Sequence, residues 1–355
     1  MPGHTHDDID WADRLSQLRM ADSLDAEALT PVARRLVTGL PERPTIVDVG
    51  CGAGGMSVLF ARELARGTGG TVVLLDATPE LLAEAKLAVS AALGRLASSA
   101  ELAAAPGGPA EAARAADEGA VGPGGPAEPA VDEGAAGPGG PAEPAVDEGA
   151  AGPGGPAEPA AGAVEVVSLL GDLADPGLAV PAADLVWASG VVHHVGDQQA
   201  ALRTLAGLLR PGGLVAIAEG GLELRCLPWE LGVGRPGLEQ RLHAARAAWF
   251  ARMRGGLPGS VAMPYGWTRA LREAGLSDVE SFGALIDHPM PGSDLLREYV
   301  VHRIGWLADW AVDWLDADDR AAVAALVDPQ SPHFLGHRDD LYLFGAKAIH
   351  CGRLR

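Results

Sequence analysis

Thr45-Ile46-Val47-Asp48-Val49-Gly50-Cys51-Gly52-Ala53-Gly54-Gly55 is the stretch that decides the fold. The apolar run Thr45–Val49 leads directly into the glycines, and Met56–Phe60 then reads as a helix. A strand, a tight turn and a helix open a nucleotide-binding α/β unit, and glycine lets the backbone turn sharply beside a ligand. The turn also satisfies G-x-G-x-x-G at Gly50, Gly52 and Gly55. A dinucleotide site therefore stays open as an alternative at this point.

Further apolar segments along the chain have the composition of buried parallel strands. They are Thr71–Leu75, Val164–Leu170, Ala183–Ala188 and Leu214–Glu219. Helical patterns separate them: one begins at Thr78-Pro79-Glu80 and runs to the mid-90s, and another runs from Gln198 to Arg210. This alternation of strand and helix predicts a parallel sheet covered on both faces.

The part beyond Glu219 has a different character and holds six of the eight tryptophans. Its patterns predict helices at 237–254, 266–274, 293–316 and 318–327, and strands at Val279–Leu285 and Asp340–Ile349. Trp306, Trp310 and Trp314 recur every four residues, which indicates first a helix face packed in a core and second the wall of a pocket.

A repeated segment interrupts the α/β pattern. A 15-residue unit rich in Gly, Pro and Ala occurs three times, at 116–130, 131–145 and 146–160. Almost nothing in it can be buried, so it cannot offset the entropy lost on ordering. Residues 98–162 are predicted to be a disordered acidic insertion.

Composition limits the classes of partner. The formal net charge of −20 argues against nucleic acid or an anionic membrane surface as the main partner. The three cysteines are widely spaced, which predicts a reducing compartment without disulfides. The polar N-terminus and the lack of long apolar runs predict a cytoplasmic protein without a membrane span.

Polar residues follow the carboxyl ends of the predicted strands, where open α/β sheets bind ligands. Asp76, Asp172 and the segment Ser189–His194 lie there, beside the glycine turn. An acid such as Asp76 can bind both hydroxyls of a ribose in either class of nucleotide site. The residues that decide against a dinucleotide site are Asp48, two residues before the first glycine, and the downstream motifs Gly171-Asp172 and Pro211-Gly212-Gly213.

Taken together, these motifs resemble the class I S-adenosylmethionine-dependent methyltransferases. The matching segments, in chain order, are Val47–Gly54, Leu75-Asp76, Gly171-Asp172-Leu173, Asp184–His194 and Pro211-Gly212-Gly213. The resemblance covers about 45–96 and 163–219 well, and extends weakly over 264–285 and the last strand. The spacing from Asp76 to Asp172 exceeds the family's usual spacing, and the repeat insertion accounts for the excess.

The resemblance implies a role for each matched residue toward S-adenosylmethionine. Asp48 helps hold the turn and the methionine end, Gly50 and Gly52 lie against the methionyl and ribose parts, and Asp76 binds the ribose hydroxyls. Asp172 accepts from the adenine amino group, and the Leu173 N–H faces the ring. The remaining expected contacts are Cys51, Ala77 and Ser189. Cys51 is interpreted as a small residue in a tight turn rather than a nucleophile.

The predicted activity is methyl transfer to a small, largely apolar metabolite. His193 and His194 lie where a general base would act, with lining of the pocket as the alternative role. No metal site is expected on this pair. Two other functions stay open: a non-catalytic binding or regulatory protein of the same fold, and an NAD-dependent oxidoreductase. The oligomeric state is also open, with a homodimer among the options.

The predicted fold class is therefore α/β, with a Rossmann-like seven-stranded, mostly parallel sheet and helices on both faces. Residues 1–44 form an N-terminal helical cap, and 45–97 with 163–219 form the core that binds S-adenosylmethionine. Residues 220–355 form a helical lid over the substrate region and supply the last two strands.

Overall fold

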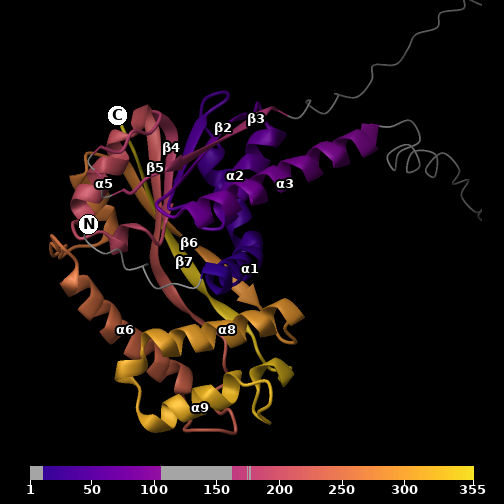
Figure 1. Cartoon of the computed structure of the whole chain (residues 1–355). Coiled ribbons are helices and arrows are strands. Elements are labelled where there is room, and N and C mark those ends of the chain that lie inside the picture. The colour runs from indigo at the N-terminus through magenta and orange to yellow at the C-terminus, as the bar shows by residue number, and fades with distance from the viewer. Residues whose placement is uncertain (1–10, 105–161, 174, 176) are drawn as a thin grey trace, which may run out of the picture. The chain divides into compact units, whose positions relative to one another are not determined.

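The computed structural model describes residues 11–104, 162–173, 175 and 177–355. Its strands are β1 (Thr45–Val49), β2 (Gly70–Asp76), β3 (Val164–Leu170), β4 (Ala183–Ser189), β5 (Leu209–Arg225), β6 (Ser277–His288) and β7 (Leu343–Arg353). They form one sheet in the order β3-β2-β1-β4-β5-β7-β6, in which β7 alone runs antiparallel to its neighbours (Figure 1). The predicted Rossmann-like, mostly parallel seven-stranded sheet is confirmed.

Helices cover both faces of this sheet. They are α1 (Trp11–Val37), α2 (Gly55–Arg66), α3 (Pro79–Ala104), α5 (Gln198–Gly207), α6 (Leu238–Gly256), α7 (Trp267–Glu273), α8 (Asp294–Trp310) and α9 (Ala317–Val327), with short 3₁₀ turns η1 (Val192–His194), η2 (Val312–Trp314) and η3 (Leu335–His337). Side chains alternate across β1: Ile46 joins the core under α1, α2 and α3, whereas Val47 and Val49 join the core under α5 and α7. The sheet is therefore buried on both sides.

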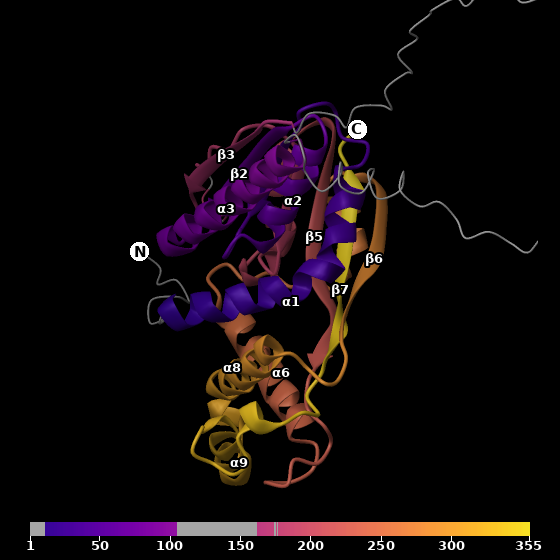
Figure 2. The ribbon, with the colours of Figure 1, turned by 90° about the vertical axis from the view of Figure 1, so that its right-hand side faces the viewer.

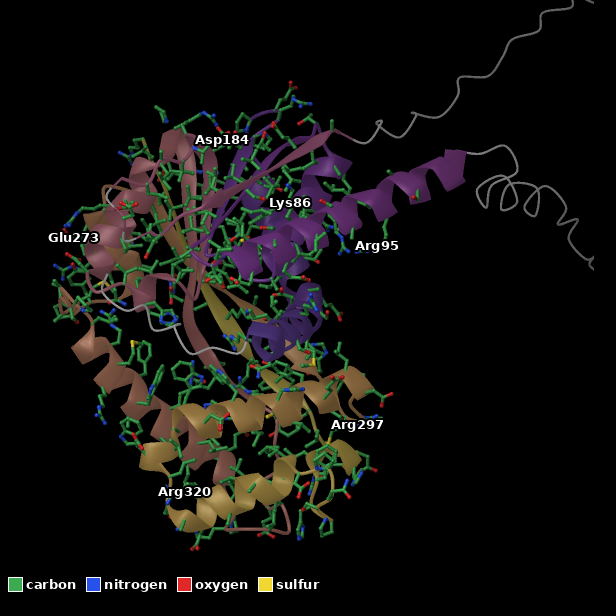
Figure 3. The ribbon with its side chains drawn as sticks, in the orientation of Figure 1. Lys86, Arg95, Asp184, Glu273, Arg297 and Arg320 are labelled. Atoms are coloured by element: carbon green, nitrogen blue, oxygen red, sulfur yellow. The ribbon has the colours of Figure 1, made fainter. Side chains whose placement is uncertain are left out.

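A third hydrophobic core lies among α6, α8 and α9. Helix α1 connects it to the sheet, because Met20 and Leu24 pack in this third core while Leu29 and Val32 pack under the sheet (Figure 2). Figure 3 labels Asp184, the second residue of β4, at the end of the sheet away from α8 and α9. The carboxyl ends of the parallel strands therefore face the helices of the third core.

Two helix ends differ from the prediction. Helix α5 stops at Gly207 rather than Arg210, because Leu209 already pairs with Ala183 in the sheet and a bulge precedes Leu214. Glycine also weakens a helix end, so tertiary pairing wins over the local pattern. The helix predicted over 293–316 ends at Trp310, so Trp306, Trp310 and Trp314 do not share one continuous helix face.

Helix α3 is longer than predicted. It continues through Ala104, into the segment 98–162 that the sequence assigns to a disordered insertion. The residues added are Ala, Ser, Glu and Leu, which include strong helix formers. Residues 105–161, which hold the repeats, lie outside the described residues. Among the helices that are described, none is long and apolar enough to cross a membrane.

Candidate functional site

The glycine turn between β1 and α2 is held by backbone hydrogen bonds to β2. The N–H groups of Gly50 and Cys51 both donate to the carbonyl of Leu75, at 2.7 and 3.1 Å. The Gly52 N–H donates to Asp76 Oδ2 at 3.1 Å. Gly50 and Gly52 have φ of 65° and 56°, a left-handed conformation that favours glycine. These hydrogen bonds thus fix the positions of the turn and Asp76 relative to each other.

Each glycine of the turn faces a different surrounding. A Cβ at Gly50 would lie 2.4 Å from Val191 Cγ2, and one at Gly54 would lie 2.8 Å from Ala85 Cα. A Cβ at Gly52 would meet no described atom within 4 Å. Gly50 and Gly54 are therefore needed for packing, whereas Gly52 leaves its outer side open to a ligand.

The loops after β2 and β3 lie side by side. The Gly171 N–H donates to the Asp76 carbonyl at 3.0 Å, which brings Asp172 next to the β2 loop. Asp76 Oδ1 accepts from the Thr78 N–H at 2.9 Å, so both oxygens of this carboxylate are oriented by backbone donors. These two backbone hydrogen bonds hold the carboxylate in one orientation at the end of β2.

The other residues expected to contact the cofactor border these loops. Ala77 is exposed directly after Asp76, Leu173 is 7% exposed in the core under α5, and Ser189 is half-buried at the end of β4. Cys51 is buried inside the turn, and burial beside Asp48 and Asp76 raises the pKa of its thiol. A thiol with a raised pKa is a poor nucleophile, in keeping with its interpretation as a small residue of the turn.

Asp48 lies beneath the turn and is nearly inaccessible. Its Oδ2 accepts a 2.5 Å hydrogen bond from Ser57 Oγ of α2. Burial raises the pKa of Asp48 to about 7, against the Ser57 hydrogen bond, and the neighbouring charges of Asp22 and Asp76 raise it further. Burial therefore keeps Asp48 largely protonated below pH 7, and a cation close to the turn would favour its ionised form.

Asp22 of α1, which the sequence analysis did not single out, adds a second carboxylate near the turn. Asp22 of α1 lies against the start of α2, where a Cβ at Gly55 would be 2.3 Å from its Oδ1. Burial raises the pKa of Asp22 to about 7, although Lys347 lowers it. Lys347 of β7 forms an ion pair of 2.6 Å with Asp25. No local sequence signal marks Asp22, because its helical pattern shows only which face of α1 is apolar.

His193 is held by a buried glutamate on the neighbouring strand. Its Nδ1 lies 2.7 Å from Glu219 Oε2, and the side chains are 25% and 3% exposed, respectively. The other oxygen, Glu219 Oε1, accepts from the N–H groups of Val191 and Val192 at 3.1 and 2.8 Å. An Nδ1–H that donates to Glu219 leaves Nε2 with a free lone pair. The same carboxylate therefore fixes both the loop and the ring.

Helix α6 holds this loop from the other side. Arg254 Nη1 donates to the carbonyls of His193 and Val195 at 2.9 and 2.5 Å. The Phe250 ring lies 5.4 Å from the His193 ring, edge on. His194 is exposed, and its ring lies 4.1 Å from the His193 ring at an interplanar angle of 40°. The ring of His193 is thus held by the Glu219 carboxylate on one side and contacted by two other rings.

Glu219 and Arg254 are two further site residues that the sequence analysis missed. A signal existed for Glu219, since it is the last residue of the predicted strand Leu214–Glu219, as Asp76 follows the predicted strand before it; in the structure β5 continues to Arg225 and Glu219 is 3% exposed. Arg254 had none, because its contacts join segments 58 to 61 residues apart. The structure brings Gly50 into contact with the His193 loop through Val191, and so joins the predicted cofactor residues to the predicted base.

Most of the chain matches a known protein family. Residues 20–281 match a family described as a methyltransferase domain. No curated protein sequence matches the chain significantly. Solved structures similar to this chain include a proposed methyltransferase (BH2331) of Bacillus halodurans, with 13% identity, coverage of 93% of this chain and 98% of that one, and a TM-score of 0.39.

Two other similar structures come from different bacteria. A proposed type II methyltransferase of Anaeromyxobacter dehalogenans has 14% identity, coverage of 91% and 95%, and a TM-score of 0.43. An S-adenosylmethionine-dependent methyltransferase of Thiobacillus denitrificans, in complex with S-adenosylhomocysteine, has 16% identity, coverage of 91% and 90%, and a TM-score of 0.37.

Proposed function

Because the chain belongs to the methyltransferase-domain family, we propose that it transfers the methyl group of S-adenosylmethionine to a small, largely apolar acceptor, with His193 as general base. The observation that carries the proposal is Glu219, which orients the His193 ring with one carboxylate oxygen and the loop beside Gly50 with the other. In this proposal residues 45–97 and 163–219 bind the cofactor, and 220–355 cover the acceptor.

The residues of the turn fit S-adenosylmethionine. The open side of Gly52 leaves room for the methionyl and ribose parts, and the preoriented Asp76 carboxylate suits a ribose diol. Asp172 and the Leu173 N–H are assigned to adenine, with Ala77 and Ser189 beside them. The positive ammonium and sulfonium groups of the cofactor would favour the ionised forms of Asp22 and Asp48, whose pKa burial raises to about 7.

When bound, S-adenosylmethionine supplies a methyl group on a positively charged sulfur, which keeps the S–C electron pair as that bond breaks. The residues of this chain then have two tasks, to position the acceptor opposite that bond and to remove its proton. His193 Nε2 accepts the proton as the acceptor forms its bond to the methyl carbon. Glu219 stabilises the imidazolium that results, because its buried carboxylate already pairs with Nδ1.

Calorimetric titration of the purified chain with S-adenosylmethionine, S-adenosylhomocysteine and NAD tests the cofactor assignment. We expect saturable binding of the first two and none of NAD. Asp76→Ala is expected to weaken binding at least about 100-fold, since it removes the ribose acceptor and the partner of the Gly52 N–H. Asp328→Ala is the matched control, because Asp328 is an exposed carboxylate outside the cofactor-binding ranges whose Oδ1 likewise accepts from the N–H two residues on.

Turnover then separates an enzyme from a binding protein. Acceptor candidates are incubated with S-adenosylmethionine labelled in its methyl group, and the product is followed by mass. Binding without transfer to any acceptor would favour the non-catalytic alternative, and binding of NAD alone would favour the oxidoreductase. Unchanged affinity in Asp76→Ala would refute the ribose assignment.

A further inference from the structure

Helix α6 links strand β5 to the His193 loop. Near the end of the helix, Arg254 donates to the carbonyl of His193 at 2.9 Å. In its first half, His243 Nδ1 lies 3.2 Å from Glu223 Oε2 of β5. Glu219 of the same strand orients the His193 ring. The loop is therefore held by two elements, β5 and α6, which are themselves joined at His243.

The His243 side chain is 8% exposed and lies between two carboxylates. Besides its contact with Glu223, its Nε2 lies 3.8 Å from Oε1 of Glu239, one turn earlier in α6. Glu239 accepts from the Cys226 N–H at 2.9 Å, which fixes it to the chain that follows β5. Within the described part of the chain, neither buried ring nitrogen has a partner with the alignment of a hydrogen bond. Attraction between opposite charges is therefore the main interaction available here, and it requires a protonated ring.

Charged groups from three elements surround this ring. They are Glu223 of β5, Glu239 and Arg246 of α6, and Arg303 of α8. Burial lowers the pKa of His243 and Arg303 lowers it too, but the two carboxylates outweigh both, so the pKa lies above its ordinary 6.5. The His243 ring, together with Arg246, holds the pKa of Glu223 at about 2. The site therefore keeps the ring charged to a higher pH than solvent would.

We propose that protonated His243 is a positioning residue: its charge fixes the first half of α6 on β5, and release of its proton to solvent loosens the hold of α6 on the His193 loop. Glu219 and Arg254 carry the effect, because one lies on β5 and the other on α6. A strand and a helix are rigid enough to transmit such a change. The consequence for the loop is independent of methyl transfer, whereas any consequence for turnover rests on the proposed function.

The pH dependence has a definite direction. Because the folded chain binds the His243 proton more tightly than the unfolded chain, the contact between α6 and β5 is fully present below pH 6.5 and is lost as the pH rises through the folded-state pKa. Asp22 and Asp48, each with a pKa of about 7, change charge in the same range. Global unfolding therefore cannot separate His243 from these groups, and the measurement has to report on the loop.

Amide hydrogen exchange of the full chain at pH 6, 7 and 8.5 measures the loop directly, once the rates are corrected for the intrinsic effect of pH. The reporters are the N–H groups of His194 and Val195, which donate to the carbonyls of Val191 and Val192. We expect the protection of these groups in the wild type to fall about tenfold between pH 6 and pH 8.5. Protection that does not change with pH would overturn the proposal.

Glu223→Gln is the main variant, because Glu223 is 55% exposed and its change to Gln leaves no cavity. It should lower the pKa of His243, measured by histidine NMR, and move the fall in protection to lower pH by the same amount. Glu230→Gln, at another exposed glutamate between β5 and α6, is the control. If Glu223→Gln shifts the titration of His243 but leaves the fall in protection in place, the loop responds to another group and the proposal is overturned.

Two changes at His243 itself test the role of its charge. His243→Gln should show at pH 6 the low protection that the wild type shows at pH 8.5. His243→Lys keeps a positive charge over this range and should restore protection at both pH values. Asp48 and His193 are unchanged in both variants, so a pH effect that arises from them would persist in both and would overturn the assignment to His243.

The outcomes for the site and for the cofactor are separable when binding of S-adenosylhomocysteine is measured on the same samples. Binding, together with loop protection that does not depend on His243, would leave the proposed function standing and remove the inference. A loop that responds to His243 in a chain that binds no S-adenosylhomocysteine would support the inference and remove the proposed function.

Discussion

Asp48 shows how a single buried carboxylate couples the stability of the protein to its ligand site. Its pKa lies at about 7 instead of the ordinary 3.8, mainly because of burial. The folded chain therefore binds one more proton than the unfolded chain between these values, and the free energy of unfolding falls as the pH rises through this window. Above this pH window the folded protein carries the full free-energy cost of an ionised buried carboxylate, and a bound cation would reduce that cost.

We expect Asp48→Asn to raise the free energy of unfolding of the ligand-free protein at pH 8. Because Asp48 is protonated in the folded state at pH 5, the advantage of Asn should shrink by roughly 2.5 kcal/mol between pH 8 and pH 5. Denaturant unfolding at both pH values measures the difference. Asp294→Asn, at an exposed carboxylate, is the control, and an advantage that stays constant with pH would contradict the assignment.

Glu219 acts through His193, so its prediction concerns the tautomer of that ring. Two-bond ¹⁵N–¹H spectra of the wild type should show a proton on Nδ1 of neutral His193, because that nitrogen faces the buried carboxylate at 2.7 Å. Glu219→Gln should redistribute the proton and, once an acceptor is known, lower kcat about 10- to 100-fold. Affinity for S-adenosylhomocysteine should change little.

Glu219 also holds the backbone of Val191 and Val192, so a structural effect must be separated from an effect on the ring. His193→Gln keeps the loop bonds of Glu219 and removes only the base. If Glu219→Gln lowers cofactor affinity as strongly as turnover, its role is to support the loop rather than to position His193.

At the scale of elements, the turn between β1 and α2 offers two glycines with the same strain and different neighbours. Gly50→Ala and Gly52→Ala both place alanine at positive φ, which costs about 1 kcal/mol. At Gly50 the added Cβ would also lie 2.4 Å from Val191, so this variant should lose about 2 kcal/mol more in stability.

At Gly52 the new methyl group would instead point into the open side of the turn. Gly52→Ala should therefore keep most of the stability and lose at least about tenfold in affinity for S-adenosylhomocysteine. Thermal unfolding and calorimetry on both variants give the comparison. Equal stability losses, with unchanged affinity in Gly52→Ala, would mean that the ligand does not approach this glycine.

Most elements of the sheet could be predicted because their signals are local. The run Thr45–Val49 and the run Gly70–Asp76 are apolar, bounded by turn residues and buried along almost their full length. The end of α5 at Gly207 could not be predicted, because it depends on the pairing of Leu209 with Ala183, 26 residues earlier. For the same reason, local sequence patterns cannot identify residues whose role depends on partners that are distant in the sequence.

The residues of the candidate site likewise fall into those that sequence predicts and those that it does not. Gly50, Asp76 and Asp172 follow strand ends, and their positions in the sequence already indicate their place at the edge of the sheet. Asp22 lies on α1 and reaches the turn only because α1 packs on α2, which no spacing along the chain reveals. Sequence alone therefore indicates the site residues that follow strand ends, and it misses the residues that only tertiary packing brings to the site.

At the scale of the whole molecule, α1 joins the sheet to the helices α6, α8 and α9. Leu29 and Leu36 belong to the core under the sheet, and Met20 and Leu24 belong to the core of α6, α8 and α9. Lys347 of β7 adds an ion pair to Asp25 of the same helix. The region proposed to bind the acceptor is therefore tied to the region proposed to bind the cofactor by one continuous element.

The described residues of the three hydrophobic cores all lie outside 97–160. Replacing 97–160 by a short Gly/Ser linker is therefore expected to leave the melting temperature within about 3 °C and the affinity for S-adenosylhomocysteine unchanged. The formal net charge would change from −20 to −10, because the replaced segment holds 11 acidic residues and one basic residue. Replacing 267–276 by the same linker is the control, since it removes the buried Ala270, Leu271 and Leu276 and should unfold the chain. A drop of more than about 10 °C on replacing 97–160 would show instead that this segment stabilises the fold.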